Sequence, residues 1–129
     1  MDLGLKSKKA LVFGASSGLG MASAKSLAAE GADIFLIARD EKKLKDVRDE
    51  IEKNYSVPCD YACFDMTQVV DVNNFVNNFM SKSFDILVNN TGGPPPSNSL
   101  NTTYDGWEKY INSIILNTIR VTNTLVTSM

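Results

Sequence analysis

The sequence predicts an α/β fold in which helices cover both faces of a doubly wound parallel sheet. Short apolar runs of strand length alternate with longer segments of helical period, which is typical of consecutive βαβ units. The chain has 129 residues, 43% of them hydrophobic, which suits one domain with a substantial core. We therefore expect a single domain over residues 1–129.

Four segments are predicted to be strands because each is short, largely apolar and bounded by turn residues or charges. They are residues 9–13, 32–38, 58–64 and 84–89. The first, second and fourth are nearly continuously apolar, as strands are when both faces of a sheet are covered. In the third, Cys59 and Cys63 would lie roughly 13 Å apart at about 3.3 Å per residue, which is too far for a disulfide bond.

Three helices are predicted between these strands, at residues 19–30, 41–55 and 68–82. Gly31 ends the first helix, because glycine readily adopts the left-handed conformation that follows a helix. The third helix has Thr67 as a candidate N-cap. The apolar stripe of the second helix consists of Leu44, Val47, Ile51 and Tyr55. The side chains that the third helix is predicted to bury are Val72, Phe75, Val76 and Phe79.

A loop and a final helix are predicted after the fourth strand. Residues 92–99 are predicted to form the loop, because their three prolines fix φ and remove backbone donors. The helix is predicted to begin near Thr103 and to run toward Met129. Its residues at helical spacing are Trp107, Ile111, Ile114, Ile115, Thr118, Ile119, Thr122, Leu125 and Val126.

The composition excludes several classes of function. The net charge is −2 and no basic run exceeds two lysines, so we expect no nucleic-acid partner. No apolar stretch approaches the length of a membrane span, and the N-terminal residues lack the form of a signal peptide. We therefore expect a cytoplasmic protein without membrane contact. The absence of histidine excludes Ser-His-Asp and Cys-His hydrolases, and no cluster has metal-ligand spacing.

The segment between the first strand and the first helix is the main indication of function. It reads Gly14-Ala15-Ser16-Ser17-Gly18-Leu19-Gly20. A glycine turn between a strand and a helix lets a pyrophosphate approach the backbone, and the N–H groups at the helix N-terminus hold anions. The spacing G-x-x-x-G-x-G differs from the common dinucleotide fingerprint and is weak by itself. Its context adds Arg39, Asp65 and residues 89–92 at the carboxyl ends of the later strands, where ligands bind in such sheets.

Together these segments resemble the classical short-chain dehydrogenase/reductase family. Residues 4–20 are similar to the family's first strand and phosphate turn, and Asn89-Asn90-Thr91-Gly92 is similar to its Asn-Asn-Ala-Gly segment. The resemblance covers the whole chain and implies a Rossmann-type sheet of order 3-2-1-4, cut short after four strands and followed by a long helix. Residues 90–95, Asn-Thr-Gly-Gly-Pro-Pro, further resemble a subgroup labelled 3-oxoacyl-carrier-protein-reductase-like.

The resemblance implies a set of cofactor-binding residues. The glycines of the turn would shape the pyrophosphate site, the two serines would lie near the adenosine ribose, and Leu19 would present its backbone N–H. The Asp65 carboxylate and the Met66 N–H would hold the adenine edge, while the segment after the fourth strand would line the ribose and nicotinamide side. The full set is Gly14, Ser16, Ser17, Gly18, Leu19, Gly20, Arg39, Asp65, Met66, Asn90, Thr91 and Gly92.

Arg39 favours NADP(H) over NAD(H) as the cofactor. It ends the second predicted strand, where NAD-specific proteins place a carboxylate for the ribose hydroxyls. A guanidinium there suits a 2′-phosphate, which it can bind with two parallel hydrogen bonds. Alternatively, Arg39 pairs with Glu41 or caps the turn, and the neighbouring Asp40 complicates the choice. For Asp65, an equally weighted alternative is that Asp65 or Thr67 caps the next helix.

Two positions depart from the family's pattern. Phe13 stands where the family usually has a threonine before the glycine turn, and Ile114 stands where it usually has an active-site asparagine. Asn112 and Asn117 lie nearby, but at ideal helical spacing they point elsewhere, so neither is assigned that role.

The family's catalytic serine, and its tyrosine with a lysine four residues later, have no match in this sequence. All four tyrosines, Tyr55, Tyr61, Tyr104 and Tyr110, precede the next expected strand. We therefore assign no catalytic residue, and we expect this chain alone to be inactive or nearly so. A longer parent would act on a small carbonyl or alcohol. The open edge of the fourth strand and the faces of the last helix predict a homo-oligomer.

Other functions stay open at this stage. The chain could instead be a non-catalytic nucleotide-binding or oligomerisation module, or a degenerate gene product. A methyl-donor-binding α/β domain also has a glycine turn after its first strand, but it would leave Arg39 and the Asn-Asn-x-Gly segment unexplained.

Overall fold

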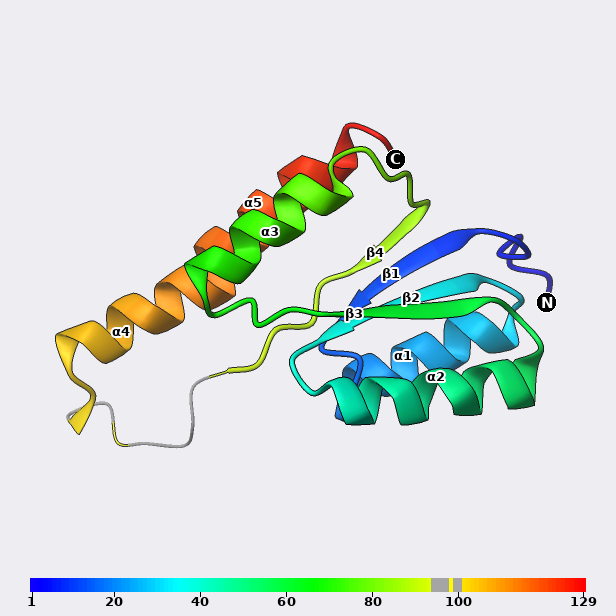
Figure 1. Cartoon of the computed structure of the whole chain (residues 1–129), viewed down its shortest axis with the longest axis horizontal. Helices are drawn as coiled ribbons and strands as arrows, with labels where there is room; N and C mark the ends of the chain where they lie inside the picture. Colours follow the sequence, from blue (N-terminus) through cyan, green and yellow to red (C-terminus); the bar gives the residue numbers. More distant parts are fainter. Residues whose placement is uncertain (94–97, 99–100) are drawn as a thin grey trace.

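The computed structural model describes residues 1–93, 98 and 101–129. Its centre is a parallel four-stranded sheet of order β3-β2-β1-β4 (Figure 1). The strands are β1 (Lys9–Phe13), β2 (Asp33–Ala38), β3 (Cys59–Cys63) and β4 (Ile86–Val88). The predicted fold class and strand order are therefore confirmed. Most of the predicted loop at residues 92–99 lies outside the described residues.

Helices lie on both faces of this sheet. Figure 1 shows α1 (Gly18–Ala29) and α2 (Glu41–Tyr55) on one face, and α3 (Val69–Phe79) and α5 (Asn117–Val126) on the other. Between them, α4 (Tyr104–Ile111) and a π-helical turn, η2 (Asn112–Leu116), lead into α5. The chain is thus a three-layer sandwich, and the carboxyl ends of its strands share one edge of the sheet.

The alternation of side chains along β1 explains why an uninterrupted apolar strand is needed. Ala10 and Val12 belong to the core beneath α1 and α2, whereas Leu11 and Phe13 belong to the core beneath α3 and α5. All four side chains are buried. The first core also contains Ala24, Ala28, Ile34, Leu36, Leu44, Val47 and Ile51. The second also contains Ile37, Phe75, Phe79, Phe84, Val121 and Leu125.

The predicted element boundaries hold best where a local capping residue marks them. The Asp40 carboxylate accepts a hydrogen bond of 3.0 Å from the Lys43 N–H, so α2 begins one residue later, as predicted. The third helix ends at Phe79 rather than at residue 82. Its N-cap is Gln68, so Thr67 does not cap it. The fourth strand is also shorter than predicted, since its pairing with β1 involves only Ile86–Val88.

The last helical segment differs most from an ideal amphipathic helix. Its inward side chains are Ser113, Asn117, Val121 and Leu125, of which Asn117 is half-buried and the others are buried. Many of the apolar residues predicted at helical spacing instead face solvent, and five of them have exposed fractions between 36% and 52%. We call these residues the exposed stripe: Trp107, Ile111, Ile114, Ile115 and Ile119. In the described chain, this stripe does not contribute to either core.

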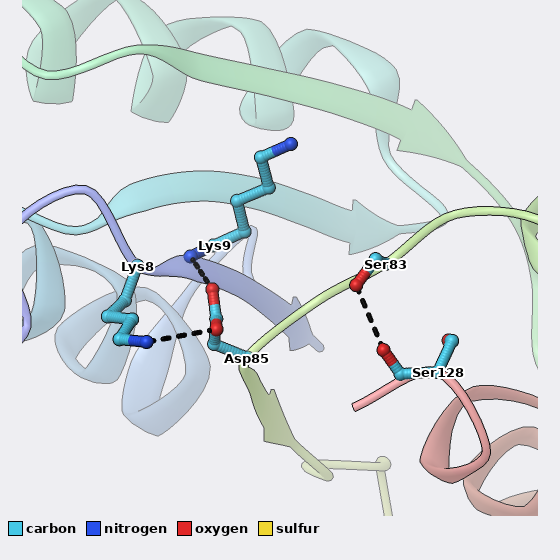
Figure 2. Close-up of polar contacts among 5 residues, drawn as sticks. All are labelled: Lys8, Lys9, Ser83, Asp85 and Ser128. Carbon is cyan, nitrogen blue, oxygen red and sulfur yellow. Dashed lines mark hydrogen bonds and ion pairs between the residues drawn. The ribbon is translucent and has the colours of Figure 1, made fainter.

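Polar contacts join segments at the end of the sheet where the strands begin, opposite their carboxyl ends (Figure 2). The Asp85 carboxylate accepts hydrogen bonds from the Lys9 backbone N–H at 2.9 Å and from Lys8 Nζ at 3.2 Å. The Ser83 hydroxyl donates to the backbone carbonyl of Ser128 at 2.9 Å. These contacts, named here the Asp85 clamp and the Ser83 clamp, fix the entry to β4 against β1 and against the end of α5.

Candidate nucleotide-binding site

The glycine turn is built around close contact with Asn90. A Cβ added to Gly14 would lie 2.6 Å from the side-chain nitrogen of Asn90 and would overlap its carbonyl oxygen. A Cβ added to Gly20 would overlap the Gly14 carbonyl and lie 2.8 Å from the same Asn90 nitrogen. The Ala15 N–H donates to the Ile37 carbonyl at 3.2 Å, which ties the turn to β2. Only glycine fits at these two positions, because the fourth strand's end is packed directly against the turn.

The start of α1 leaves its backbone donors open to an anion. Ser17 is the N-cap residue with an extended backbone, yet its hydroxyl makes no capping hydrogen bond. The first turn of the helix also carries no acidic side chain that would occupy its positive end. Backbone N–H groups at such a helix start are good partners for phosphate oxygens.

A cavity of about 740 Å³ lies along the carboxyl edge of the sheet. Its volume is typical of ligand sites. Of the sequence-predicted residues, it is lined by Gly14, Ser16, Ser17, Gly18, Leu19, Arg39, Asp65, Met66, Asn90, Thr91 and Gly92. Gly20 does not line it, because this residue lies beneath the turn against Gly14. The structure therefore brings together, from all four strand ends, the side chains that the sequence places far apart.

Arg39 is exposed at the end of β2, and within the described residues its side chain takes up neither of the competing roles considered for it. None of the ion pairs among the described residues involves Arg39, so it does not pair with Glu41. Asp40 caps α2 and its other oxygen lies 3.7 Å from Lys43 Nζ. The Cys63 thiol donates to the Arg39 carbonyl at 3.2 Å, which holds the backbone of Arg39 beside the cavity.

The turn after β3 is fixed by side chains on its own segment. The N–H and hydroxyl of Thr67 both donate to Asp65 Oδ1, at 3.0 and 2.8 Å, and Asp71 Oδ2 accepts from the Asp65 N–H at 2.7 Å. Neither Asp65 nor Thr67 caps α3, so that alternative is wrong. Within the described residues, Asp65 Oδ2 has no hydrogen-bond partner, which leaves one carboxylate oxygen for a ligand.

The cavity-lining residues from the last helical segment were missed by sequence reasoning. Lys109 and Tyr110 from α4, and Ser113 from η2, complete the wall opposite the glycine turn. Ser113 is 5% exposed, and its hydroxyl donates to the Tyr110 carbonyl at 3.3 Å. The polar pair Asn112-Ser113, between the apolar residues Ile111 and Ile114, was the signal that could have found this side of the helix. Ile114, at the position of the family's asparagine, does not line the cavity.

The two cysteines remain free thiols, as the sequence predicts. Burial is the main cause that raises the pKa of the Cys59 thiol to about 12, with the Glu52 carboxylate adding to it. Burial also raises the pKa of Cys63, with nearby carboxylates adding to the shift. Both groups are therefore neutral at physiological pH, and neither is suited to act as a nucleophile.

Comparison with known proteins identifies the family. A model of the short chain dehydrogenase family matches residues 8–129. The chain belongs to the short-chain dehydrogenase family. An uncharacterised oxidoreductase of Bacillus subtilis is 33% identical over an alignment of 130 residues, which covers all of this chain and 48% of that protein. This short-chain dehydrogenase chain spans about half the length of the curated relatives it matches.

Solved structures of short-chain dehydrogenases have the same fold. L-sorbose reductase from Gluconobacter frateurii, in complex with NADPH and L-sorbose, matches with a TM-score of 0.90 and 30% identity, covering 100% of this chain and 50% of that one. A short-chain dehydrogenase from Sphingobium yanoikuyae, in complex with NADPH, has a TM-score of 0.87 and 25% identity, covering 93% and 47%. Among the described residues, no helix has both the length and the apolar character to cross a membrane.

Proposed function

We propose that this chain forms the NADP(H)-binding part of a short-chain reductase or dehydrogenase that interconverts a small carbonyl compound and its alcohol. The observation that carries the proposal is the cavity at the carboxyl edge of the sheet, where the glycine turn, Arg39, Asp65 and Asn90 meet. Two solved relatives in complex with NADPH support the choice of cofactor class. The substrate class rests on the family to which the chain belongs.

Each part of the cavity suits one part of the dinucleotide. The open N–H groups at the start of α1 would bind the diphosphate, with Ser16 and Ser17 beside the adenosine ribose. The free Oδ2 of Asp65 and the N–H of Met66 would bind the adenine edge. Thr91 and Gly92, which line the same cavity, would lie on the ribose and nicotinamide side. When bound, the cofactor supplies or accepts the hydride, while this chain holds and orients it.

Within this proposal, the chain contributes binding rather than acid–base chemistry. Tyr110 and Lys109 line the cavity, but they are consecutive on a helix and therefore point about 100° apart. They lack the family's spacing of four residues between tyrosine and lysine. We propose low turnover for these 129 residues by themselves, since a missing general acid alone costs about 10²- to 10⁴-fold in rate.

The narrower subgroup remains part of the proposal. Residues 90–95 resemble the 3-oxoacyl-carrier-protein-reductase-like subgroup, and the described part of this segment, Asn90–Gly93, lines the cavity. The exposed stripe favours self-association as an additional property, because contiguous apolar surface of this kind typically marks an interface.

The test of the cofactor assignment compares NADPH and NADH binding to the wild-type chain and to Arg39→Ala. We expect the wild type to prefer NADPH, and the substitution to weaken NADPH binding by roughly 10- to 100-fold, because a charge-assisted hydrogen-bond pair is lost. NADH binding should change little. Isothermal titration calorimetry gives both dissociation constants.

Lys42→Ala is the matched control, because Lys42 is an exposed cation near the start of α2. It should leave the NADPH preference intact. A wild type without preference, or an Arg39→Ala variant that keeps it, would contradict the 2′-phosphate role of Arg39.

A further inference from the structure

One contact joins the last helix to the turn that follows β3. The Asn117 side chain donates from Nδ2 to the carbonyl of Met66 at 2.7 Å, in a partly buried position. The other hydrogen bonds that fix this turn come from nearby residues, Thr67, Gln68 and Asp71. Asn117 reaches it from 51 residues away in the sequence. The turn is therefore held by residues of its own segment and, independently, by a side chain of α5, which is distant in the sequence.

The π-helical turn explains why Asn117 faces inward. Ser113, Asn117, Val121 and Leu125 share the inner side at a constant spacing of four residues. In an ideal α-helix a spacing of four drifts by about 40° at each step, which would carry the series off a single face. The wide turn η2 takes up one additional residue and offsets most of this drift. The irregular helix thus aligns an amide with the Met66 carbonyl.

The hydrogen bonds that join the turn to Asp71 and to Asn117, both 2.7 Å long, lie on either side of one peptide group. Asp71 holds the N–H of Asp65, and Asn117 holds the carbonyl of Met66. The carbonyl of the peptide between them, that of Asp65, accepts from the Gln68 N–H at 2.9 Å, so this peptide is held at its own oxygen and on both sides. This peptide carries the Met66 N–H. The same turn presents the free Oδ2 of Asp65 to the cavity.

We infer that Asn117 is a positioning residue for adenine recognition, and this inference rests on the proposed NADP(H)-binding function. Asn117 holds the turn in the one orientation in which Asp65 Oδ2 accepts from the exocyclic amino group while the Met66 N–H donates to ring atom N1. Asn117 does not line the cavity and touches no ligand itself. We expect its effect to fall on the base, since Asn117 donates to the Met66 carbonyl and to neither Arg39 nor the glycine turn.

The experiment compares NADPH with its analogue in which hypoxanthine replaces adenine. Hypoxanthine presents an oxygen acceptor where adenine has its amino group, and an N1–H donor where adenine has an acceptor. Asp65 Oδ2 would then face an oxygen and the Met66 N–H would face another N–H, so both contacts are repulsive. We expect the wild type to bind NADPH at least about tenfold more tightly. Asn117→Ala should weaken NADPH binding by about 3- to 10-fold and leave the analogue unchanged, which lowers the selectivity ratio. Fluorescence titration measures both affinities.

Asn117→Asp separates the hydrogen-bond donor from the side-chain volume. It keeps the size of Asn117 but places a carboxylate against the Met66 carbonyl, so it should lower the ratio at least as much. Asn123→Ala is the control, because Asn123 is an exposed asparagine on the same helix and should leave the ratio unchanged. The ratio is insensitive to a partly unfolded sample, since both nucleotides bind the same folded fraction.

Three outcomes overturn the inference. If both variants weaken the two nucleotides equally, or leave the ratio unchanged, Asn117 only stabilises the fold. If the wild type binds both nucleotides equally well, the turn does not recognise adenine, although NADP(H) binding itself survives. If the wild type binds neither nucleotide, the proposed function fails and the inference fails with it.

Discussion

At the scale of single residues, Asn90 determines the shape of the phosphate turn. Its side-chain nitrogen occupies the space in which a Cβ of Gly14 or of Gly20 would lie. The glycines are therefore required by packing between the end of β4 and the turn, as well as by the approach of a ligand. Sequence spacing alone indicates a turn, but it does not identify the side chain that closes it.

Gly20→Ala should destabilise the protein by about 1–3 kcal/mol, because the new methyl group overlaps the Gly14 carbonyl and crowds Asn90. Urea unfolding followed by circular dichroism measures the free energy of unfolding. Gly93→Ala is the control, since a Cβ there meets no atom of the described residues within 4 Å, and its effect should stay within about 0.5 kcal/mol. Equal stability of the two variants would contradict the packing role of Gly20.

The sequence predicts which residues come together where chemistry and chain position agree, while their roles in cofactor binding stay predictions. Arg39, Asp65 and Asn90 follow strands whose carboxyl ends meet at one edge, so their convergence on a cavity was predictable. The sequence did not predict how the Asp65 side chain is used, as a helix cap or as a ligand-binding group. A carboxylate can accept hydrogen bonds from a hydroxyl, from the backbone and from a ligand at the same time. In the structure Asp65 Oδ1 accepts both hydrogen bonds from Thr67, which leaves Oδ2 for the proposed ligand.

At the scale of elements, the pairing of β1 with β4 depends on the Asp85 clamp. The backbone N–H of Lys9 lowers the pKa of Asp85 from 3.8, and the Lys8 ammonium lowers it further. A carboxyl whose pKa is lower in the folded state stabilises the fold above its unfolded pKa, and this contribution is lost as the pH falls through the folded value. The clamp therefore weakens only in acid.

Asp85→Asn should lower stability at pH 7 and reduce the loss of stability between pH 5 and pH 2, because asparagine does not titrate. Urea unfolding across this pH range measures both effects. Asp46→Asn, at an exposed position on α2, is the control and should keep the wild-type pH profile. If Asp85→Asn and the wild type lose stability in parallel on acidification, the clamp does not contribute to the pH dependence.

Elements with strong local signals were predictable from sequence, and elements shaped by tertiary contacts were not. The second helix has the predicted bounds because Asp40 caps it. The fourth strand is shorter than its apolar run, since Phe84 packs in a core and Asp85 forms the clamp. The π-helical turn η2 has no periodic signature, because one inserted residue blurs a period of 3.6 without replacing it.

At the scale of the whole molecule, the exposed stripe predicts self-association. Ile115 and Ile119 are each about half exposed on the side of the last helix opposite Val121 and Leu125. Sedimentation velocity should show a concentration-dependent oligomer for the wild type. The double variant Ile115→Glu/Ile119→Glu should shift the equilibrium toward monomer, because burial of carboxylates in an apolar contact is unfavourable.

Asn123→Glu is the control for added negative charge at an exposed position of α5, and it should leave the oligomer intact. A wild-type chain that sediments as a monomer at all concentrations would contradict this prediction. The sequence placed these apolar residues on the last helix, but it did not reveal which of them face solvent, because η2 resets the register of the helix.

The Asp85 and Ser83 clamps lie at the edge of the sheet where strands begin, whereas the candidate nucleotide site occupies the edge where they end. The residues of the two clamps are therefore separate from those that line the candidate site. Substitutions at the clamps could therefore raise resistance to heat or acid, while substitutions at the other ends of the strands change nucleotide preference. Because the two groups of residues are distant and share no partner among the residues that the structure describes, their effects should be nearly additive.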